Sequence, residues 1–241
     1  MALVGRFPAL AGVDLDVAHG EIVLLAGPNG AGKTSLLRLC AGLLPIARGS
    51  AVVLGHDLTS DRRTVRRRVG FVGHATALYD DLTVRDNVRF WARAAGATAA
   101  DADAAMDRLA IPARLADVAV HRLSAGQRRR TSIAAVVARR PELWLLDEPH
   151  AGLDVDARDL LDELVREAVA GGATAIVASH ELERARGLAD RAVQVVGGQV
   201  LDSTAIEGGD ADGSRSSRNA GGACHEPGVS GASTDDAVDV A

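Results

Sequence analysis

The sequence predicts an α/β fold, in which a mainly parallel sheet is interrupted by an inserted helical subdomain. Short apolar runs alternate with amphipathic helical patterns at both ends of the chain, which is typical of a parallel sheet covered by helices. The middle of the chain, residues 82–140, is helical and breaks that alternation. A glycine-rich loop at residues 27–34 joins a predicted strand to a predicted helix, as phosphate-binding loops do.

The first elements follow from local pattern. Residues 21–27 (EIVLLAG) are a short apolar run that ends at glycine, as a buried strand does. The helix that starts at Thr34 carries leucines on one face, and we expect it to end at Pro45. Two further runs, residues 50–55 (SAVVLG) and 67–73 (RRVGFVG), predict the next strands.

The helical subdomain is predicted from caps and breakers. A helix begins after Thr83 and stops near Gly96, with an aspartate at the capping-box position. Residues 97–122 are helical, with a break at a proline. Ser124 can cap a helix that runs to residue 140, where another proline follows.

The last third returns to alternating strands and helices. Residues 142–149 (ELWLLDEP) predict a buried strand, and residues 155–170 an amphipathic helix closed by two glycines. Residues 174–180 (TAIVASH) predict another buried strand, and residues 192–201 (AVQVVGGQVL) a hairpin with a Gly-Gly turn. Beyond the hairpin Gly, Ser, Asp and Ala dominate without periodicity, so we expect residues 204–241 to be a disordered tail.

The predicted organisation is therefore a folded domain over residues 1–203 and a tail. The net charge of −5 belongs mainly to the tail, since residues 202–241 have a balance of −6 and leave +1 for the body. A nearly neutral body argues against nucleic acid as a partner. We interpret the basic runs at residues 62–68 and 128–130 as solvated faces. No apolar run reaches membrane-spanning length and no signal peptide is evident, so a cytosolic location is expected.

The segment GPNGAGKT, residues 27–34, has the Gly-x-x-x-x-Gly-Lys-Thr pattern of a phosphate loop. Its glycines allow backbone N–H groups to surround a phosphate, and the following helix adds the positive end of its dipole. Lys33, the single lysine among 27 basic residues, can bridge the β- and γ-phosphates, and the Thr34 hydroxyl can ligate Mg²⁺. The alternative, an ordinary glycine-rich turn, does not account for the flanking strand and helix.

The segment LWLLDE, residues 143–148, is an apolar strand that ends in two carboxylates. Beside a phosphate loop, Asp147 can hold Mg²⁺ and Glu148 can act as a base or orient the attacking water. Taken alone, the same segment could equally be a strand followed by an acidic turn.

Three weaker motifs flank the two carboxylates. LSAGQ (residues 123–127) stands about twenty residues before them, GLD (residues 152–154) follows them closely, and ASH ends the next strand at His180. Ser124 could be a plain helix cap and His180 a polar residue at a strand end. Each motif is weak evidence by itself, and it is their order and spacing together that indicate a shared functional site.

Together these motifs resemble the ATP-binding subunit of an ATP-binding-cassette (ABC) transporter over residues 9–201. The resemblance implies a P-loop NTPase fold with a RecA-like parallel-sheet core and an inserted helical subdomain, an ABC-type nucleotide-binding domain. It implies ATP and Mg²⁺ as cofactors and hydrolysis of ATP to ADP and phosphate. It also implies a head-to-tail dimer, homodimeric or heterodimeric, in which ATP lies between the phosphate loop of one domain and the signature of the other.

The resemblance also assigns roles to individual residues. It assigns ATP binding to Gly27, Pro28, Asn29, Gly30, Ala31, Gly32, Lys33, Thr34 and Ser35. It assigns the signature, which meets the partner's ATP, to Leu123, Ser124, Ala125, Gly126 and Gln127, with Ala125 where glycine is commoner. It assigns the metal to Thr34 and Asp147, the general base to Glu148, the γ-phosphate contact to His180 and the inter-subunit loop to Asp154.

His74 stands where this family usually has a glutamine, directly after the strand VGFV. In the family that residue touches Mg²⁺ and the attacking water, and the loop after it meets the membrane subunit. A neutral imidazole can donate or accept one hydrogen bond as glutamine can, but it responds to pH. We therefore interpret His74 as a catalytic-site residue, the alternative being an ordinary loop residue. Its pairing with LSAG resembles the haem exporter ATPases of cytochrome c maturation.

The function that follows is ATP hydrolysis that powers transport through separate membrane-spanning permease subunits, at the cytoplasmic face of the membrane. Haem export for cytochrome c biogenesis is the preferred system, and export of a drug or another small molecule is the alternative. A non-transport ABC ATPase acting on ribosomes or DNA is the alternative from another class, disfavoured by the single cassette and short insert. Phe7 is the only candidate for the aromatic residue that stacks on adenine in this family, and we interpret His150 as a surface or turn residue.

Overall fold

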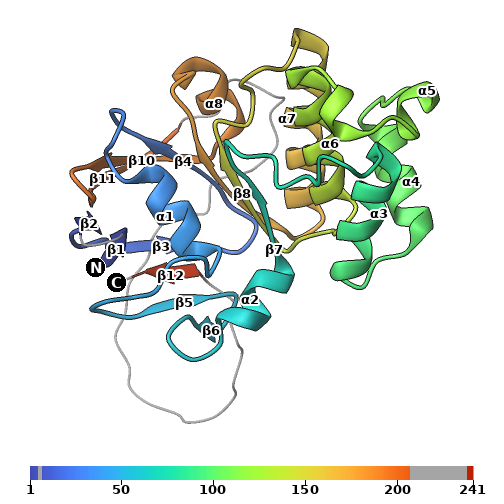
Figure 1. The fold of residues 1–241 in the computed structure, drawn as a ribbon. Coiled ribbons are helices and arrows are strands. Elements are labelled where there is room, and N and C mark those ends of the chain that lie inside the picture. Colours follow the sequence, from blue (N-terminus) through green and yellow to red (C-terminus); the bar gives the residue numbers. More distant parts are fainter. Residues whose placement is uncertain (5–6, 207–237, 241) are drawn as a thin grey trace, which may run out of the picture.

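A computed structural model describes residues 1–4, 7–206 and 238–240 and is built around a six-stranded sheet (Figure 1). The strand order is β11-β10-β4-β9-β8-β7, and all neighbours run parallel except β10 and β11. The strands are β4 (Ile22–Ala26), β7 (Val69–Val72), β8 (Leu143–Asp147), β9 (Thr174–Ala178), β10 (Arg191–Val196) and β11 (Gln199–Ala205). The predicted mainly parallel sheet is confirmed.

Helices cover both faces of this sheet, as the apolar runs require. They are α1 (Lys33–Cys40), α2 (Arg62–Arg68), α7 (Val155–Ala170) and α8 (Leu182–Leu188). Every residue of β8 is buried, and successive side chains enter opposite cores: Leu145 packs with the residues of α1, and Leu146 with those of α7. The sheet is therefore the common wall of two hydrophobic cores.

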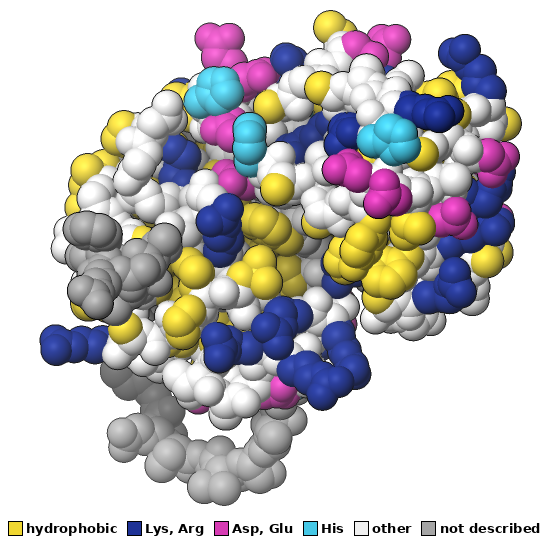
Figure 2. Space-filling view, in the orientation of Figure 1, with side chains coloured by type: hydrophobic (Ala, Val, Ile, Leu, Met, Phe, Trp, Pro, Cys, Tyr) yellow, Lys and Arg dark blue, Asp and Glu magenta, His cyan; other side chains and the backbone are white. Residues whose placement is uncertain are grey.

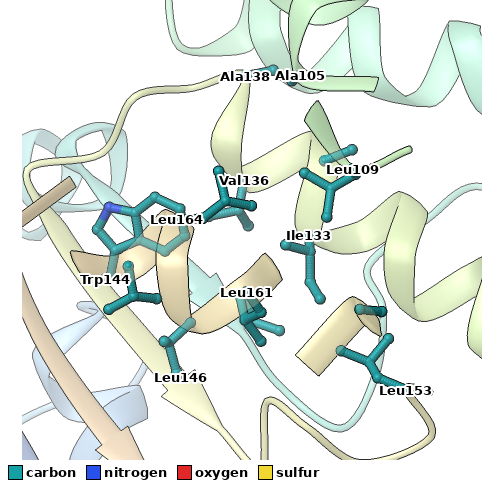
Figure 3. Close-up of a cluster of buried hydrophobic side chains, with 14 of the residues drawn as sticks. Ala105, Leu109, Ile133, Val136, Ala138, Trp144, Leu146, Leu153, Leu161 and Leu164 are labelled. Atoms are coloured by element: carbon teal, nitrogen blue, oxygen red, sulfur yellow. The ribbon is translucent and has the colours of Figure 1, made fainter. Parts of the chain in front are cut away.

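The helical subdomain lies beside the sheet and consists of α3 (Val84–Ala94), α4 (Ala99–Arg108), α5 (Ala113–Ala116), a 3₁₀ turn η1 (Val120–Arg122) and α6 (Ala125–Val137). Figure 3 shows side chains from β8, α6 and α7 meeting in one apolar cluster, among them Trp144, Ile133 and Leu161. This continuous core joins the subdomain to the sheet. The predicted caps are confirmed, since Thr83 accepts from Asp86 N and Ser124 from Gln127 N.

Smaller strands complete the chain. β3 (Leu15–Val17), β12 (Val238–Val240), β5 (Ala51–Val53) and β6 (His56–Asp57) form an antiparallel sheet in the order β3-β12-β5-β6. β1 (Ala2–Val4) pairs with β2 (Phe7–Leu10). Within the described residues no helix is both long and apolar enough to cross a bilayer.

Two predicted element boundaries need correction. The first helix ends at Cys40 rather than Pro45, because Gly42 adopts a φ of 67°, a common way to terminate a helix. Residues 67–68, predicted as strand, belong to α2, whose N-cap Asp61 accepts from Thr64 N.

The predicted disordered tail starts too early, since β11 continues to Ala205 through backbone pairing with β10. Residues 238–240, also placed in that tail, form β12 by pairing with β3 and β5, which the alternating sequence Val-Asp-Val suits. The rest of the predicted tail, residues 207–237 and 241, lies outside the described residues.

Candidate active site

The carboxyl ends of β4, β7 and β8 open into a cavity of about 530 Å³. The cavity is lined by Ala9, Asn29, Gly30, Ala31, Gly32, Lys33, Thr34, Ser35, His74, Asp147, Glu148, Gly197 and Gly198. The structure thus brings together most of the predicted phosphate loop, both carboxylates and His74, from segments more than 100 residues apart in the sequence. This is the edge of a parallel sheet where ligands bind in open α/β folds.

The path of the phosphate loop depends on glycine. Gly27 has a φ of 145°, and a Cβ at this position would lie 2.1 Å from the carbonyl oxygen of Val195. Gly32, with a φ of 109°, is the N-cap of α1, so the loop leads directly into the amino end of that helix. The backbone geometry is suited to receiving an anion at this end of α1.

Lys33 and Thr34 begin α1 and face the cavity. The Lys33 ammonium donates to the carbonyl oxygens of Gly27 (2.7 Å) and Pro28 (3.1 Å), inside the loop itself. The Thr34 hydroxyl donates to Asp147, 2.9 Å from Oδ2 and 3.1 Å from Oδ1. The hydroxyl and the carboxylate form a set of oxygen donors of the kind that Mg²⁺ prefers.

Glu148 has a φ of 48°, a left-handed conformation that is unusual for a residue other than glycine. Its N–H donates to the carbonyl oxygen of Ala178 at 2.8 Å. Its carboxylate Oε2 is 2.7 Å from His180 Nδ1 and 3.2 Å from the backbone nitrogen of His180. His180 does not line the cavity but contacts the carboxylate that does.

The signature residues face a different space. Ser124, Gly126, Gln127 and Asp154 line a second cavity of about 310 Å³ that shares no lining residue with the first. Ser124 and Gln127 form a reciprocal capping box at the start of α6, and Asp154 caps α7 and pairs with Arg130. Within one chain the signature is therefore not part of the phosphate-loop cavity.

Two polar residues near Glu148 are more deeply buried than the sequence indicated. Arg129, placed on a solvated face, is only 6% exposed and donates to backbone carbonyls on either side of Glu148. Burial lowers the pKa of Arg129, while attraction to Asp147 and Glu148 acts in the opposite direction. One signal was available, since residue 129 lies four positions before the core residue Ile133 and so shares its helix face.

His150, interpreted as a surface or turn residue, lies in a turn but is only 1% exposed. Its Nε2 is 2.6 Å from Asp162 Oδ1 on α7, and Arg184 on α8 binds the other oxygen of Asp162 at 2.5 Å. No sequence pattern announces this contact, because the three residues come from separate segments.

The fold and the phosphate loop facing two carboxylates define the class of protein as a P-loop nucleoside triphosphatase. The family described as "ABC transporter" matches residues 10–151, more than half of the chain. The chain belongs to this family, as an ATP-binding domain, and the resemblance of the motifs is confirmed.

Relatives within the family serve different systems. Daunorubicin resistance ATP-binding protein DrrA3 of Streptomyces coeruleorubidus is 40% identical over 84% of this chain and 66% of its own length. Cytochrome c biogenesis ATP-binding export protein CcmA of Rhodospirillum rubrum is 40% identical over 73% of this chain and 76% of its own length. The chain thus spans just under two thirds of DrrA3 and about three quarters of CcmA.

A solved structure shares the fold closely. It is the dimeric post-hydrolysis state of the ATP-binding cassette MJ0796 bound to ADP and phosphate, with a TM-score of 0.78 and 26% identity. The match covers 83% of this chain and 91% of that structure. The predicted P-loop NTPase fold of the ABC type is therefore confirmed.

Proposed function

We propose that this chain hydrolyses ATP to drive export through separate membrane-spanning permease subunits, at the cytoplasmic face of the membrane. The observation that carries the proposal is the shared cavity, in which Lys33, Thr34, Asp147, Glu148 and His74 surround one space at the end of the sheet. A triphosphate, a divalent cation and an attacking water are the components that such a set of groups can hold.

The phosphate loop binds the nucleotide first. Residues 27–35 surround the β- and γ-phosphates, and the Lys33 ammonium leaves the carbonyls of Gly27 and Pro28 to bridge these phosphates. Thr34 and Asp147 would hold Mg²⁺, which would supply charge neutralisation of the phosphate oxygens. Their existing hydroxyl–carboxylate contact shows that both oxygen groups reach the same point.

Glu148 is the general base of the proposed reaction. It accepts a proton from water as the water oxygen bonds to the γ-phosphorus, and the bond to the β–γ bridging oxygen breaks to release ADP. His180 holds the Glu148 carboxylate through Nδ1, which leaves Nε2 for the γ-phosphate. His74, which lines the same cavity, would orient the water or a ligand of the metal.

The separation of the signature cavity from the phosphate-loop cavity supports a head-to-tail dimer. In such a dimer the segment from Leu123 to Gln127, with the amino end of α6, completes the partner's ATP site. Asp154, exposed at the amino end of α7, lies beside that segment through its ion pair with Arg130 and is placed to cross the dimer interface.

An exposed aromatic cluster supports a permease-docking surface. Tyr79 and Phe90 are about half exposed, and the rings of Tyr79, Phe90 and Trp91 pack together at pairwise centroid distances of 5.0–6.3 Å. Trp91 also lines a small groove between α3, α6 and the segment that follows His74. Figure 2 shows hydrophobic side chains gathered in a hollow between the two halves of the face that it draws. A membrane subunit can cover these apolar groups.

Haem export for cytochrome c biogenesis is the proposed system, supported by the relative CcmA and by the pairing of His74 with the LSAG signature. Drug or other small-molecule export is the second candidate, favoured by the equal identity to DrrA3. A role on ribosomes or DNA has no such support among the relatives described.

The test is purification of the tagged full chain from detergent-solubilised native membranes, followed by identification of bound polypeptides. A multi-span partner with cytochrome c assembly proteins is expected. A multi-span partner without them would favour general export, and ribosomal or DNA-repair partners alone would contradict the transport proposal.

A further inference from the structure

Arg129 reaches four backbone carbonyls with one guanidinium. Its Nη1 donates to Gly73 O, its Nη2 to Asp147 O (3.2 Å) and Glu148 O (2.7 Å), and its Nε to Pro149 O (3.3 Å). No carboxylate is among these four acceptors, and burying a guanidinium is unfavourable unless its donors are satisfied. Such an arrangement calls for an explanation beyond packing.

The four carbonyls belong to the two segments that carry catalytic side chains. Three of them belong to Glu148 and its two neighbours, and the left-handed backbone of Glu148 persists only if its surroundings hold it in place. The fourth, that of Gly73, directly precedes His74. Arg129 therefore connects the turn at Glu148 to the start of the His74 loop.

We propose that Arg129 is a positioning residue for ATP hydrolysis, which fixes the Glu148 turn relative to the His74 loop where both segments line one cavity. The inference rests on the proposed function and adds a residue to it. Because Arg129 lies on α6, the helix that Ser124 caps, a movement of the signature is passed directly to the backbone of Glu148.

The chemistry requires arginine rather than another cation. A guanidinium presents five N–H donors in a planar fork, so it can meet carbonyls in several directions at once. A lysine ammonium has its three donors on one atom, and glutamine has two on one nitrogen. Neither can span both the Gly73 carbonyl and the Asp147–Pro149 turn.

The experiment compares Arg129→Lys and Arg129→Gln with wild type, using the purified full chain. We expect kcat for MgATP to fall about tenfold or more, because misplacing a catalytic group slows the chemical step. ATP affinity, measured with a fluorescent ATP analogue, should stay within about threefold, since the phosphate loop is untouched. The matched control is Arg128→Gln, which removes an outer ion pair with Asp80 and should keep kcat within about twofold.

A second measurement separates positioning from general stabilisation. In a background that carries both Glu148→Gln and His74→Gln, adding Arg129→Gln should change the residual turnover by less than about twofold, because both groups that Arg129 positions are already altered. A further large loss, an unchanged kcat in Arg129→Lys, or parallel losses of affinity, melting temperature and kcat would overturn the inference. A wild-type chain without turnover, alone or with its partner subunits, would overturn the proposed function and the inference with it.

Discussion

The carboxylate of Glu148 and the imidazole of His180 lie in direct contact, with Oε2 2.7 Å from Nδ1. They belong to turns at the ends of two adjacent parallel strands, β8 and β9, which are paired from Leu143 to Asp147. The pairing of the strands thus sets the distance between the two side chains. A carboxylate held in place by an imidazole at the rim of a cavity is the arrangement that the proposed general base needs.

Glu148→Gln should abolish turnover but keep ATP binding. The amide preserves the size and the contacts of the side chain but cannot accept a proton, so we expect kcat to fall about 100-fold or more. Phosphate release and binding of a fluorescent ATP analogue measure the two effects. Asp81→Asn, an exposed acidic residue that does not line the cavity, is the control. Unchanged turnover in Glu148→Gln would exclude it as the base.

Lys33→Ala should weaken nucleotide binding itself. The ammonium is the only lysine charge in the chain and faces the cavity, so its loss removes charge-assisted hydrogen bonds to phosphate. We expect the dissociation constant for ATP to rise about tenfold or more, measured by calorimetry, with Lys33→Arg as a partial rescue. Retention of wild-type affinity in Lys33→Ala would contradict the assignment of the phosphate loop.

The elements with a strong local pattern could be predicted from the sequence. The helix predicted over residues 155–170 is observed as α7 with the same bounds, because its apolar face and terminal glycines are all local signals. α2 was missed because its only buried apolar residue is Val65, so no periodicity shows among its arginines. Its single visible signal was the cap at Asp61.

The residues of the candidate site also divide into those that local sequence predicts and those that it does not. The phosphate loop and the pair Asp147–Glu148 could be predicted because each is contiguous in sequence and sits at a strand end. Arg129 could not be assigned, because its burial depends on Gly73 and on the Glu148 turn, which only the folded chain brings together. Local sequence specifies the groups proposed to meet the nucleotide better than the groups that hold them in position.

His74→Gln should keep most of the activity and flatten its pH dependence. Glutamine makes the same kind of hydrogen bond without changing charge, whereas imidazoles change charge between about pH 5 and pH 8. We expect the ratio of wild-type to variant turnover to change across this window, in phosphate-release assays at constant ionic strength. His121→Gln, an exposed histidine outside the cavity, is the control. Parallel profiles would make His74 an ordinary loop residue.

Cys40 should resist alkylation in the folded protein. Burial raises the pKa of its thiol to about 12, so at pH 8 only about one thiol in 10,000 is ionised. In a Cys224→Ser variant Cys40 is the only thiol, and iodoacetamide labelling followed by mass spectrometry reports on it alone. We expect slow labelling that becomes fast in denaturant. Fast labelling under native conditions would contradict the buried position in α1.

His150→Leu should destabilise the fold through Asp162. The carboxylate of Asp162 is buried and shared between His150 on the turn after Glu148 and Arg184 on α8. Leucine fills the space but leaves one carboxylate oxygen without this partner, so we expect the free energy of unfolding to fall by about 1–3 kcal/mol in urea titrations. His121→Leu, at an exposed position, should change it by less than about 0.5 kcal/mol.

A double-mutant cycle shows whether the loss of unfolding free energy in His150→Leu arises at the Asp162 carboxylate. If His150 acts through Asp162, the loss caused by His150→Leu should shrink in an Asp162→Asn background, because the buried charge that needed a partner is gone. If the two losses add instead, His150 stabilises the turn through packing alone. In that case the 2.6 Å contact between Nε2 and Oδ1 contributes little to stability.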